Sequence, residues 1–255
     1  MELLPRIHNI LQEHQIFSHL NQGITVASVS DAGKGITLAK DIIEEIVDQK
    51  TVLYLSGGST PKALYEQFAK EKHIKPGAIG LIDERYGEPM HDKSNEKMIR
   101  ETGLLTYATA LGIPVHLPLQ GVSREETAEA YDETIRQLTA TFQKCVGVLG
   151  IGNDGHTSGI APNRFYFHNP LFEKEKSHLL FSEFSDSKSF YGERVAMTFL
   201  GLSMLDVLIV LVFGSAKKHA LQQLFEEGSE EEIPARFFKR PDIARKTLLI
   251  TELPA

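Results

Sequence analysis

The hydrophobic residues of this chain fall into short, continuous runs that alternate with longer segments of helical spacing. In the run VLIVLVF, residues 207–213, every position is apolar, whereas a strand with one face in water would alternate apolar and polar residues. Such a strand is covered on both faces, so we expect a mainly parallel sheet with helices on each side. Strands are predicted at residues 24–29, 51–55, 79–83, 115–118, 146–151, 195–199, 207–213 and 247–251. Helices are predicted at residues 32–47, 61–70, 94–101, 124–142 and 215–225.

The repeated strand–helix order predicts a single α/β domain over residues 1–255, in which residues 1–22 form an N-terminal helical extension. Of the 255 residues, 42% are hydrophobic, which is enough for a sizeable core, and no stretch rich in proline, glycine and serine divides the chain. In open parallel sheets, ligands bind outside the carboxyl ends of the strands, where loops lead into helices. The loops at these strand ends are therefore the candidates for functional side chains.

Charge and cysteine content limit the kinds of partner. The net charge of −7 disfavours nucleic acid, which binds to clustered lysines and arginines, but a few local cations and backbone N–H groups can still hold one phosphate. The single cysteine, Cys145, can form neither an intrachain disulfide nor a cysteine metal cluster. The N-terminal sequence lacks a secretory pattern, and the longest apolar run is far below the ~20 residues that span a bilayer. We expect a cytoplasmic protein without nucleic-acid or membrane partners.

The loop SGGSTP, residues 56–61, has the composition of an anion-binding turn. Gly57 and Gly58 would let the backbone approach an anion closely, and the proline would suit the first helical position. Ser59 and Thr60 add hydroxyl groups beside the free N–H groups at the start of the following helix. The same residues would also suit an ordinary strand-to-helix turn with a serine or threonine cap, and the Walker pattern is absent.

The strongest signal lies in GVLGIGNDGHTSGIAPN, residues 147–163, where a buried strand leads into a glycine-rich loop. Imidazole titrates near neutral pH, so His156 could take a proton from water. Asp154, two positions away, could orient the imidazole ring or hold a ligand hydroxyl. An isolated loop histidine is more often satisfied by the backbone, but the dense glycines at a strand end favour a catalytic role. Because no second histidine or carboxylate follows at helical ligand spacing, we expect no metal here.

Charged side chains stand at three further strand ends. Asp83, Glu84 and Arg85 form an uninterrupted charged run at the end of a predicted strand, and Arg194 directly precedes another. Lys217 and Lys218 fall in the first turn of a predicted helix, where cations oppose the helix dipole unless an anion is bound. Charges at such places are costly unless they are solvated, paired or used on a ligand. Ordinary surface turns and surface lysines remain the alternative.

Five groups of motifs, taken in order, resemble the 6-phosphogluconolactonase family, within the superfamily that includes glucosamine-6-phosphate deaminase. They are SGGSTPKALY (56–65), DERY (83–86) with SN (94–95), GIGNDGHTSGIAP (150–162), RVAMT (194–198) with FGSAKKHAL (213–221), and IPARFF (233–238). The resemblance spans residues 24–251. It implies a Rossmann-like α/β fold and hydrolysis of 6-phospho-D-glucono-1,5-lactone in the pentose phosphate pathway, with no metal or other cofactor. The partner would be a small phosphosugar lactone, and the protein a monomer or small homo-oligomer.

By position in these motifs, the resemblance implies a role for each candidate residue. His156 would be the base that activates water for attack on the lactone carbonyl, with Asp154 beside it. Arg85, Arg194 or a backbone N–H group would meet the charge that develops on the carbonyl oxygen. The residues implied to bind the substrate and its phosphate are Gly57, Gly58, Ser59, Thr60, Asp83, Arg194 and Lys217.

One segment departs from the family pattern. Relatives usually continue the DGHT sequence with A-S-L-F-P, whereas residues 158–162 here read S-G-I-A-P, which removes an aromatic side chain from the sugar pocket. A deaminase or aldose–ketose isomerase of the same superfamily would use Asp83 as base and His156 for ring opening, but it usually carries a further acid after the histidine, which is missing here. A non-catalytic sugar-phosphate sensor is the third possibility, and it would need an attached partner or DNA-binding domain.

Overall fold

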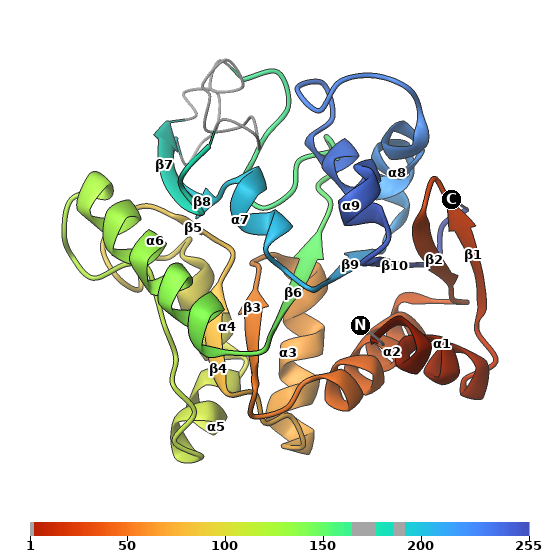
Figure 1. Ribbon diagram of the computed structural model, residues 1–255, viewed down its shortest axis with the longest axis horizontal. Coiled ribbons are helices and arrows are strands. Elements are labelled where there is room, and N and C mark those ends of the chain that lie inside the picture. The colour runs from red at the N-terminus through yellow and green to blue at the C-terminus, as the bar shows by residue number, and fades with distance from the viewer. Residues whose placement is uncertain (1–2, 165–176, 186–191, 255) are drawn as a thin grey trace.

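The computed structural model describes residues 3–164, 177–185 and 192–254 (Figure 1). Within this part of the chain, the main sheet has seven strands in the order β1-β2-β10-β9-β6-β3-β4. The strands are β1 (Phe17–Asn21), β2 (Ile24–Ser28), β3 (Thr51–Leu55), β4 (Ala78–Leu81), β6 (Lys144–Gly150), β9 (Val207–Val212) and β10 (Thr247–Thr251). All neighbouring pairs are parallel except β1 with β2. The predicted fold class, an α/β domain with a mainly parallel sheet, is confirmed.

Helices cover both faces of this sheet. One group is α1 (Leu3–Glu13), α2 (Ala32–Ile46), α3 (Ser59–Glu71), α4 (Asn95–Glu101) and α5 (Leu104–Ala110). The other is α6 (Arg124–Thr141), α7 (Phe199–Ser203), α8 (Lys218–Phe225) and α9 (Pro241–Ala244), with the 3₁₀ helices η3 (Ser215–Lys217) and η4 (Pro234–Lys239). Val148 and Leu211 pack with the first group, whereas Leu149 and Val210 pack with the second. Successive residues of one strand thus enter different cores, which explains why these strands are apolar at every position.

A smaller antiparallel sheet stands at the carboxyl edge of the main one. In the described residues it contains β5 (Asp83–Arg85), β8 (Glu193–Met197) and β7 (Phe181–Ser185), in that order. Ile82 joins the two sheets, because its N–H donates to the Leu55 carbonyl (2.9 Å) while its own carbonyl accepts the Met197 N–H (2.8 Å). The strand predicted at residues 79–83 is therefore divided at this residue.

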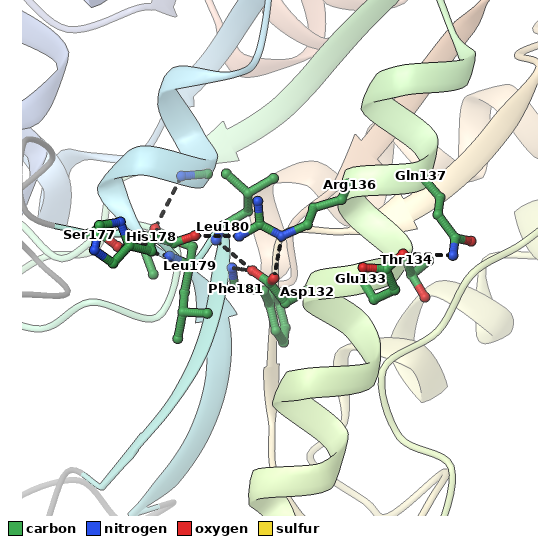
Figure 2. A network of polar contacts seen from close by, with 12 residues as sticks. Asp132, Glu133, Thr134, Arg136, Gln137, Ser177, His178, Leu179, Leu180 and Phe181 are labelled. Carbon is green, nitrogen blue, oxygen red and sulfur yellow. Dashed lines mark hydrogen bonds and ion pairs between the residues drawn. The ribbon is translucent and has the colours of Figure 1, made fainter.

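Helix α6 holds the small sheet by polar contacts (Figures 1 and 2). The buried Asp132 accepts the N–H groups of Leu180 (2.6 Å) and Phe181 (2.9 Å) on one oxygen and Arg136 Nε (2.7 Å) on the other. Arg136 also donates to the carbonyl of His178. These bonds satisfy the backbone just before and at the start of β7 and join it to the helix.

Arg124, at the other end of the same helix, contacts the far ends of β7 and β8. Its guanidinium donates to Ser185 Oγ (2.7 Å) and forms ion pairs with Glu183 (2.7 Å) and Glu193 (3.0 Å). The small sheet is thus attached to α6 at both ends through charged side chains.

Several predictions of local structure were wrong. Residues 115–118 form no strand, and Val115 makes an isolated bridge with Ile79. The N-terminal segment is helical only in α1 and then forms the strand β1, while β7 was not predicted at all. Helix α3 begins at Ser59, so Pro61 is its third residue rather than its first. Pro61 is still tolerated, because the N–H groups of the first turn have no partner within the helix.

Candidate active site

A pocket of about 370 Å³ lies at the carboxyl ends of the main-sheet strands, beside the small sheet. The predicted residues that line it are Gly57, Gly58, Ser59, Thr60, Asp83, Arg85, His156, Arg194 and Lys217. Asp154 stands behind the lining and contacts His156. The predicted site residues therefore meet in one place, while their chemical roles stay predictions.

The loop between β3 and α3 forms one wall of this pocket. It is anchored at Ser56, whose N–H donates to the Val148 carbonyl (3.1 Å) and whose carbonyl accepts the buried hydroxyl of Tyr65 (2.9 Å). Gly58 has φ +109, a conformation that side-chain-bearing residues rarely adopt. Among the described residues, no side chain caps the start of α3, so the amides of its first turn are left for a ligand.

The loop after β6 presents the imidazole of His156. Its Nδ1 lies 2.5 Å from Asp154 Oδ1, which also accepts the His156 backbone N–H (3.1 Å). Burial alone would raise the pKa of Asp154, but the hydrogen bonds and charge of His156 outweigh it and lower this pKa to about 2. Because an ionised carboxylate only accepts hydrogen bonds, Nδ1 carries a proton toward it, and in the neutral form of the imidazole Nε2 then holds the lone pair.

Backbone contacts fix the position of this ring. A Cβ on Gly152 would lie 2.0 Å from His156 Nδ1, so the ring rests directly on this glycine. The Gly152 N–H donates to the His156 carbonyl (2.8 Å), and Thr157 Oγ1 donates to the carbonyl of Gly150 (2.9 Å). The histidine side chain is still 48% exposed, which distinguishes it from a histidine packed in the core.

The small sheet brings cations to the opposite wall. Arg85 on β5 is paired with Arg194 on β8, and both line the pocket. Directly opposed like charges destabilise a sheet, so an anion bound near this pair would relieve the repulsion. One Arg85 nitrogen, Nη1, donates to the carbonyl of Lys93 (2.8 Å), which fixes the direction of the guanidinium.

Lys217 approaches the pocket from η3 rather than from a regular first helical turn. Its ammonium donates to the carbonyl of Ile151, at the start of the loop that carries His156. Burial lowers the pKa of Lys217, and the charge of Asp154 opposes this shift. The contact places a cation beside the histidine loop.

Other pocket residues had no role predicted from the sequence. Among them are Asn95, Asn153 and Ser158. Ser158 has φ +52, and a Cβ on the next residue, Gly159, would meet the carboxylate of Asp83 at 3.3 Å. The segment that departs from the family pattern is thus a tight turn against the small sheet, and this departure was the signal available in the sequence. The Ser94-Asn95 pair was noticed only as part of a motif.

Possible metal ligands elsewhere lie outside this pocket. Within the described residues, Glu44, Glu71 and His73 form a group whose ligand atoms lie within 4.8 Å of one another. None of the three lines the pocket. The prediction of a site without metal therefore stays a prediction. No helix in the described ranges is long and apolar enough to cross a membrane.

An α/β fold whose strand-end loops set an imidazole and a helix N-terminus beside two arginines of a small second sheet defines an enzyme-like site for a small anionic ligand. Residues 32–248 match the family model described as glucosamine-6-phosphate isomerases/6-phosphogluconolactonase. The chain therefore belongs to this family.

Relatives agree with this assignment. A protein from Rhizobium meliloti named 6-phosphogluconolactonase is 31% identical over 193 residues, which cover 74% of this chain and 79% of the relative. One of the same name from Synechocystis sp. is 30% identical over 204 residues, with coverages of 72% and 76%.

Solved structures share the fold. The 6-phosphogluconolactonase from Plasmodium vivax matches with a TM-score of 0.77 and 18% identity, over 98% of this chain and 96% of that chain. The 6-phosphogluconolactonase from Thermotoga maritima matches with a TM-score of 0.69 and 24% identity, over 89% and 97%. At these identities the likeness concerns the fold alone.

Proposed function

We propose that the protein hydrolyses 6-phospho-D-glucono-1,5-lactone to 6-phospho-D-gluconate, with His156 as the base. The observation that carries this proposal is the contact between His156 Nδ1 and the ionised Asp154, because a neutral imidazole held in this way presents Nε2 as the proton acceptor in a pocket for an anionic ligand. Membership of the family and the names of the relatives support the choice of substrate. The cytoplasm remains the proposed location.

The reaction needs one proton to move twice. His156 Nε2 takes a proton from water while the water oxygen bonds to the lactone carbonyl carbon, and Asp154 stabilises the imidazolium. The carbonyl oxygen becomes an oxyanion. When this intermediate collapses, the bond from C1 to the ring oxygen breaks, and His156 returns its proton to that oxygen. The carboxylic acid that results loses a proton to solvent.

The other residues bind and orient the substrate in this proposal. The amides at the start of α3, with Ser59 and Thr60, hold the phosphate together with Arg194 and Lys217. Arg85 meets the oxyanion, a contribution that for one donor typically amounts to ~10²–10³ in rate. Because the phosphate fixes the ring, the lactone carbonyl is oriented for attack.

Proton release with freshly prepared 6-phosphogluconolactone tests the proposal. Catalysis of this reaction, with a much lower rate on the unphosphorylated lactone, is the expected result, since the phosphate supplies the orientation. Equal rates on both lactones would contradict the phosphate site. An absence of catalysis on the phosphorylated lactone would overturn the function.

A deaminase or isomerase of amino-sugar phosphates remains the second candidate, and the location of Asp83 in the pocket favours it. In that reaction Asp83 would take the proton from carbon, and His156 would open the sugar ring. Residues 158–161 contain no carboxylate to assist the histidine, which counts against it. Ammonia release from glucosamine 6-phosphate would decide for this candidate, and binding without turnover of either compound would indicate a sensor.

A further inference from the structure

Asn95, the first residue of α4, stands at the meeting point of two pocket walls. Its side chain is buried, with the residue only 1% exposed, although it lines the pocket. We propose that Asn95 is a positioning residue that holds β5 and the loop between β3 and α3 (residues 56–58, the phosphate loop) at the separation the substrate requires. The kinetic part of this inference rests on the proposed lactonase function, whereas the structural part does not.

Hydrogen bonds fix Asn95 to β5. Its Nδ2 donates to the backbone carbonyl of Asp83 (2.8 Å) and lies 3.3 Å from the carboxylate of the same residue. Its backbone N–H donates to Glu84 Oε1 (2.6 Å), and the Glu96 N–H donates to the other oxygen (2.9 Å). The fully buried Glu84 also accepts the N–H of Arg85 (2.8 Å). The start of α4 therefore cannot shift without disturbing Asp83 and Arg85.

The other side of the same carboxamide touches the phosphate loop. A Cβ on Gly57 would lie 1.8 Å from Asn95 Oδ1, 2.2 Å from Cγ and 2.8 Å from Nδ2. Gly57 does not have a positive φ, so its backbone would accept an alanine. Glycine is required at this position because the Asn95 side chain fills the space. The carboxamide thus acts as a spacer between the two walls, bonded to one and in van der Waals contact with the other.

This geometry separates two effects that substitutions can measure. Replacing Asn95 by aspartate keeps its shape and its contact with Gly57, but it turns an oxygen toward the carbonyl and carboxylate oxygens of Asp83. Replacing Gly57 by alanine removes no hydrogen-bonding group, but the added methyl group pushes the Asn95 carboxamide away. Replacing Asn95 by alanine removes all three atoms that a Cβ on Gly57 would meet.

A double-mutant cycle in thermal unfolding tests the spacer without any substrate. Gly57→Ala in the wild-type background should lower Tm by roughly 5 °C, the effect of overpacking a buried contact. In the Asn95→Ala background the same substitution should change Tm by less than about 1–2 °C, since the clash is gone. Additive effects of the two substitutions would overturn the proposal, whatever reaction the protein catalyses.

Kinetics test the positioning role. Asn95→Asp should lower kcat by about 10- to 100-fold, because Asp83 and Arg85 move relative to the bound substrate, while the Kd of 6-phosphogluconate stays within about 3-fold. Ser94→Ala is the matched control: it removes the helix cap that accepts the Lys97 N–H (2.9 Å), one residue away, without touching Asp83 or Gly57. A kcat for Asn95→Asp within about 2-fold of wild type, or an equal loss in Ser94→Ala, would overturn the positioning role.

The unfolding experiment and the kinetic experiment keep this inference distinct from the proposed function. If wild-type protein does not hydrolyse the lactone, the proposed function fails, and the unfolding cycle still supports or overturns the spacer. If wild-type protein is active and the Asn95 variants behave like the Ser94 control, the lactonase stands and the role of Asn95 falls.

Discussion

The two sheets build the pocket in different ways. The main sheet offers backbone amides, one imidazole and one lysine from the loops that follow β3, β6 and β9, strands whose central residues are all buried. The small sheet offers charged side chains on β5 and β8, and α6 holds it by ion pairs and charged hydrogen bonds. One wall is positioned by apolar packing and the other by polar contacts.

This difference predicts how each wall responds to substitution. A parallel strand between two cores is held in place by many small apolar contacts, so the loss of any one polar side chain should not displace it. A short antiparallel sheet held by a few charged side chains should depend most on the buried one, Asp132. Substitutions in the two walls should therefore separate loss of chemistry from loss of positioning.

The largest effect is expected at the main-sheet loop. His156→Ala should lower kcat by about 10²–10⁴-fold, because it removes the base, while 6-phosphogluconate still binds to the helix amides. Steady-state proton release and calorimetric titration with 6-phosphogluconate would measure the two quantities. Unchanged turnover would exclude His156 as the base.

Substitutions of the paired arginines sharpen the role of the small sheet. Arg85→Ala should lower kcat by about 10²-fold with little change in KM, since it meets charge that exists only in the transition state. Arg194→Ala should instead raise both KM and the Kd of 6-phosphogluconate, with partial recovery in Arg194→Lys. If Arg194→Ala instead lowered kcat alone and Arg85→Ala weakened binding, the roles of the two arginines would be exchanged.

The attachment of the small sheet to α6 should affect stability. Asp132→Ala leaves the N–H groups of Leu180 and Phe181 without their acceptor, which should cost about 2 kcal/mol and lower Tm by roughly 4–8 °C. Glu133→Gln is the control, because within the described ranges this neighbouring side chain makes only an exposed contact with Gln137 (2.9 Å). Equal unfolding temperatures for the two variants would show that the buried contact does not hold the sheet.

The smallest effect on stability is expected for Asp154 at acidic pH. Its folded-state pKa of about 2 lies below its ordinary value of 3.8, so its ionised form stabilises the folded protein. This contribution is fully present above pH 3.8 and is lost as the pH falls through about 2. The Tm difference between wild type and Asp154→Asn should therefore shrink as the pH falls below 4, and a difference that stays the same from pH 4 down to pH 2 would contradict the lowered pKa. Its size should be small, because the carboxylate is half exposed.

The same two regions explain what the sequence could reveal. Strands β3 and β10 were predicted to the residue, because continuous apolar runs identify a doubly covered strand. Strand β7 was missed, because its sequence, FSEFS, contains no continuous apolar run. Residues 79–83 were predicted as a single strand, whereas the chain changes sheet at Ile82. This change depends on hydrogen bonds to residues that are distant in the sequence.

The site shows the same limit. Glycine-rich strand ends indicated His156 and the residues near Gly57, because a strand end and a helix start are local features. Arg194 and Lys217 were noted as charges at strand ends, and the family resemblance then gave them a role in binding the phosphate. The contact between Asn95 and Gly57 joins positions that are 38 residues apart in the sequence, and no local pattern predicts it.

A crystal structure with bound 6-phosphogluconate would test the central claim most directly, since both walls must then contact one ligand. We predict the phosphate within hydrogen-bond distance of the amides of Ser59 and Thr60, and the C1 carboxylate within hydrogen-bond distance of His156 Nε2. A ligand whose phosphate lies away from these amides, or whose C1 lies beyond reach of the imidazole, would contradict the account.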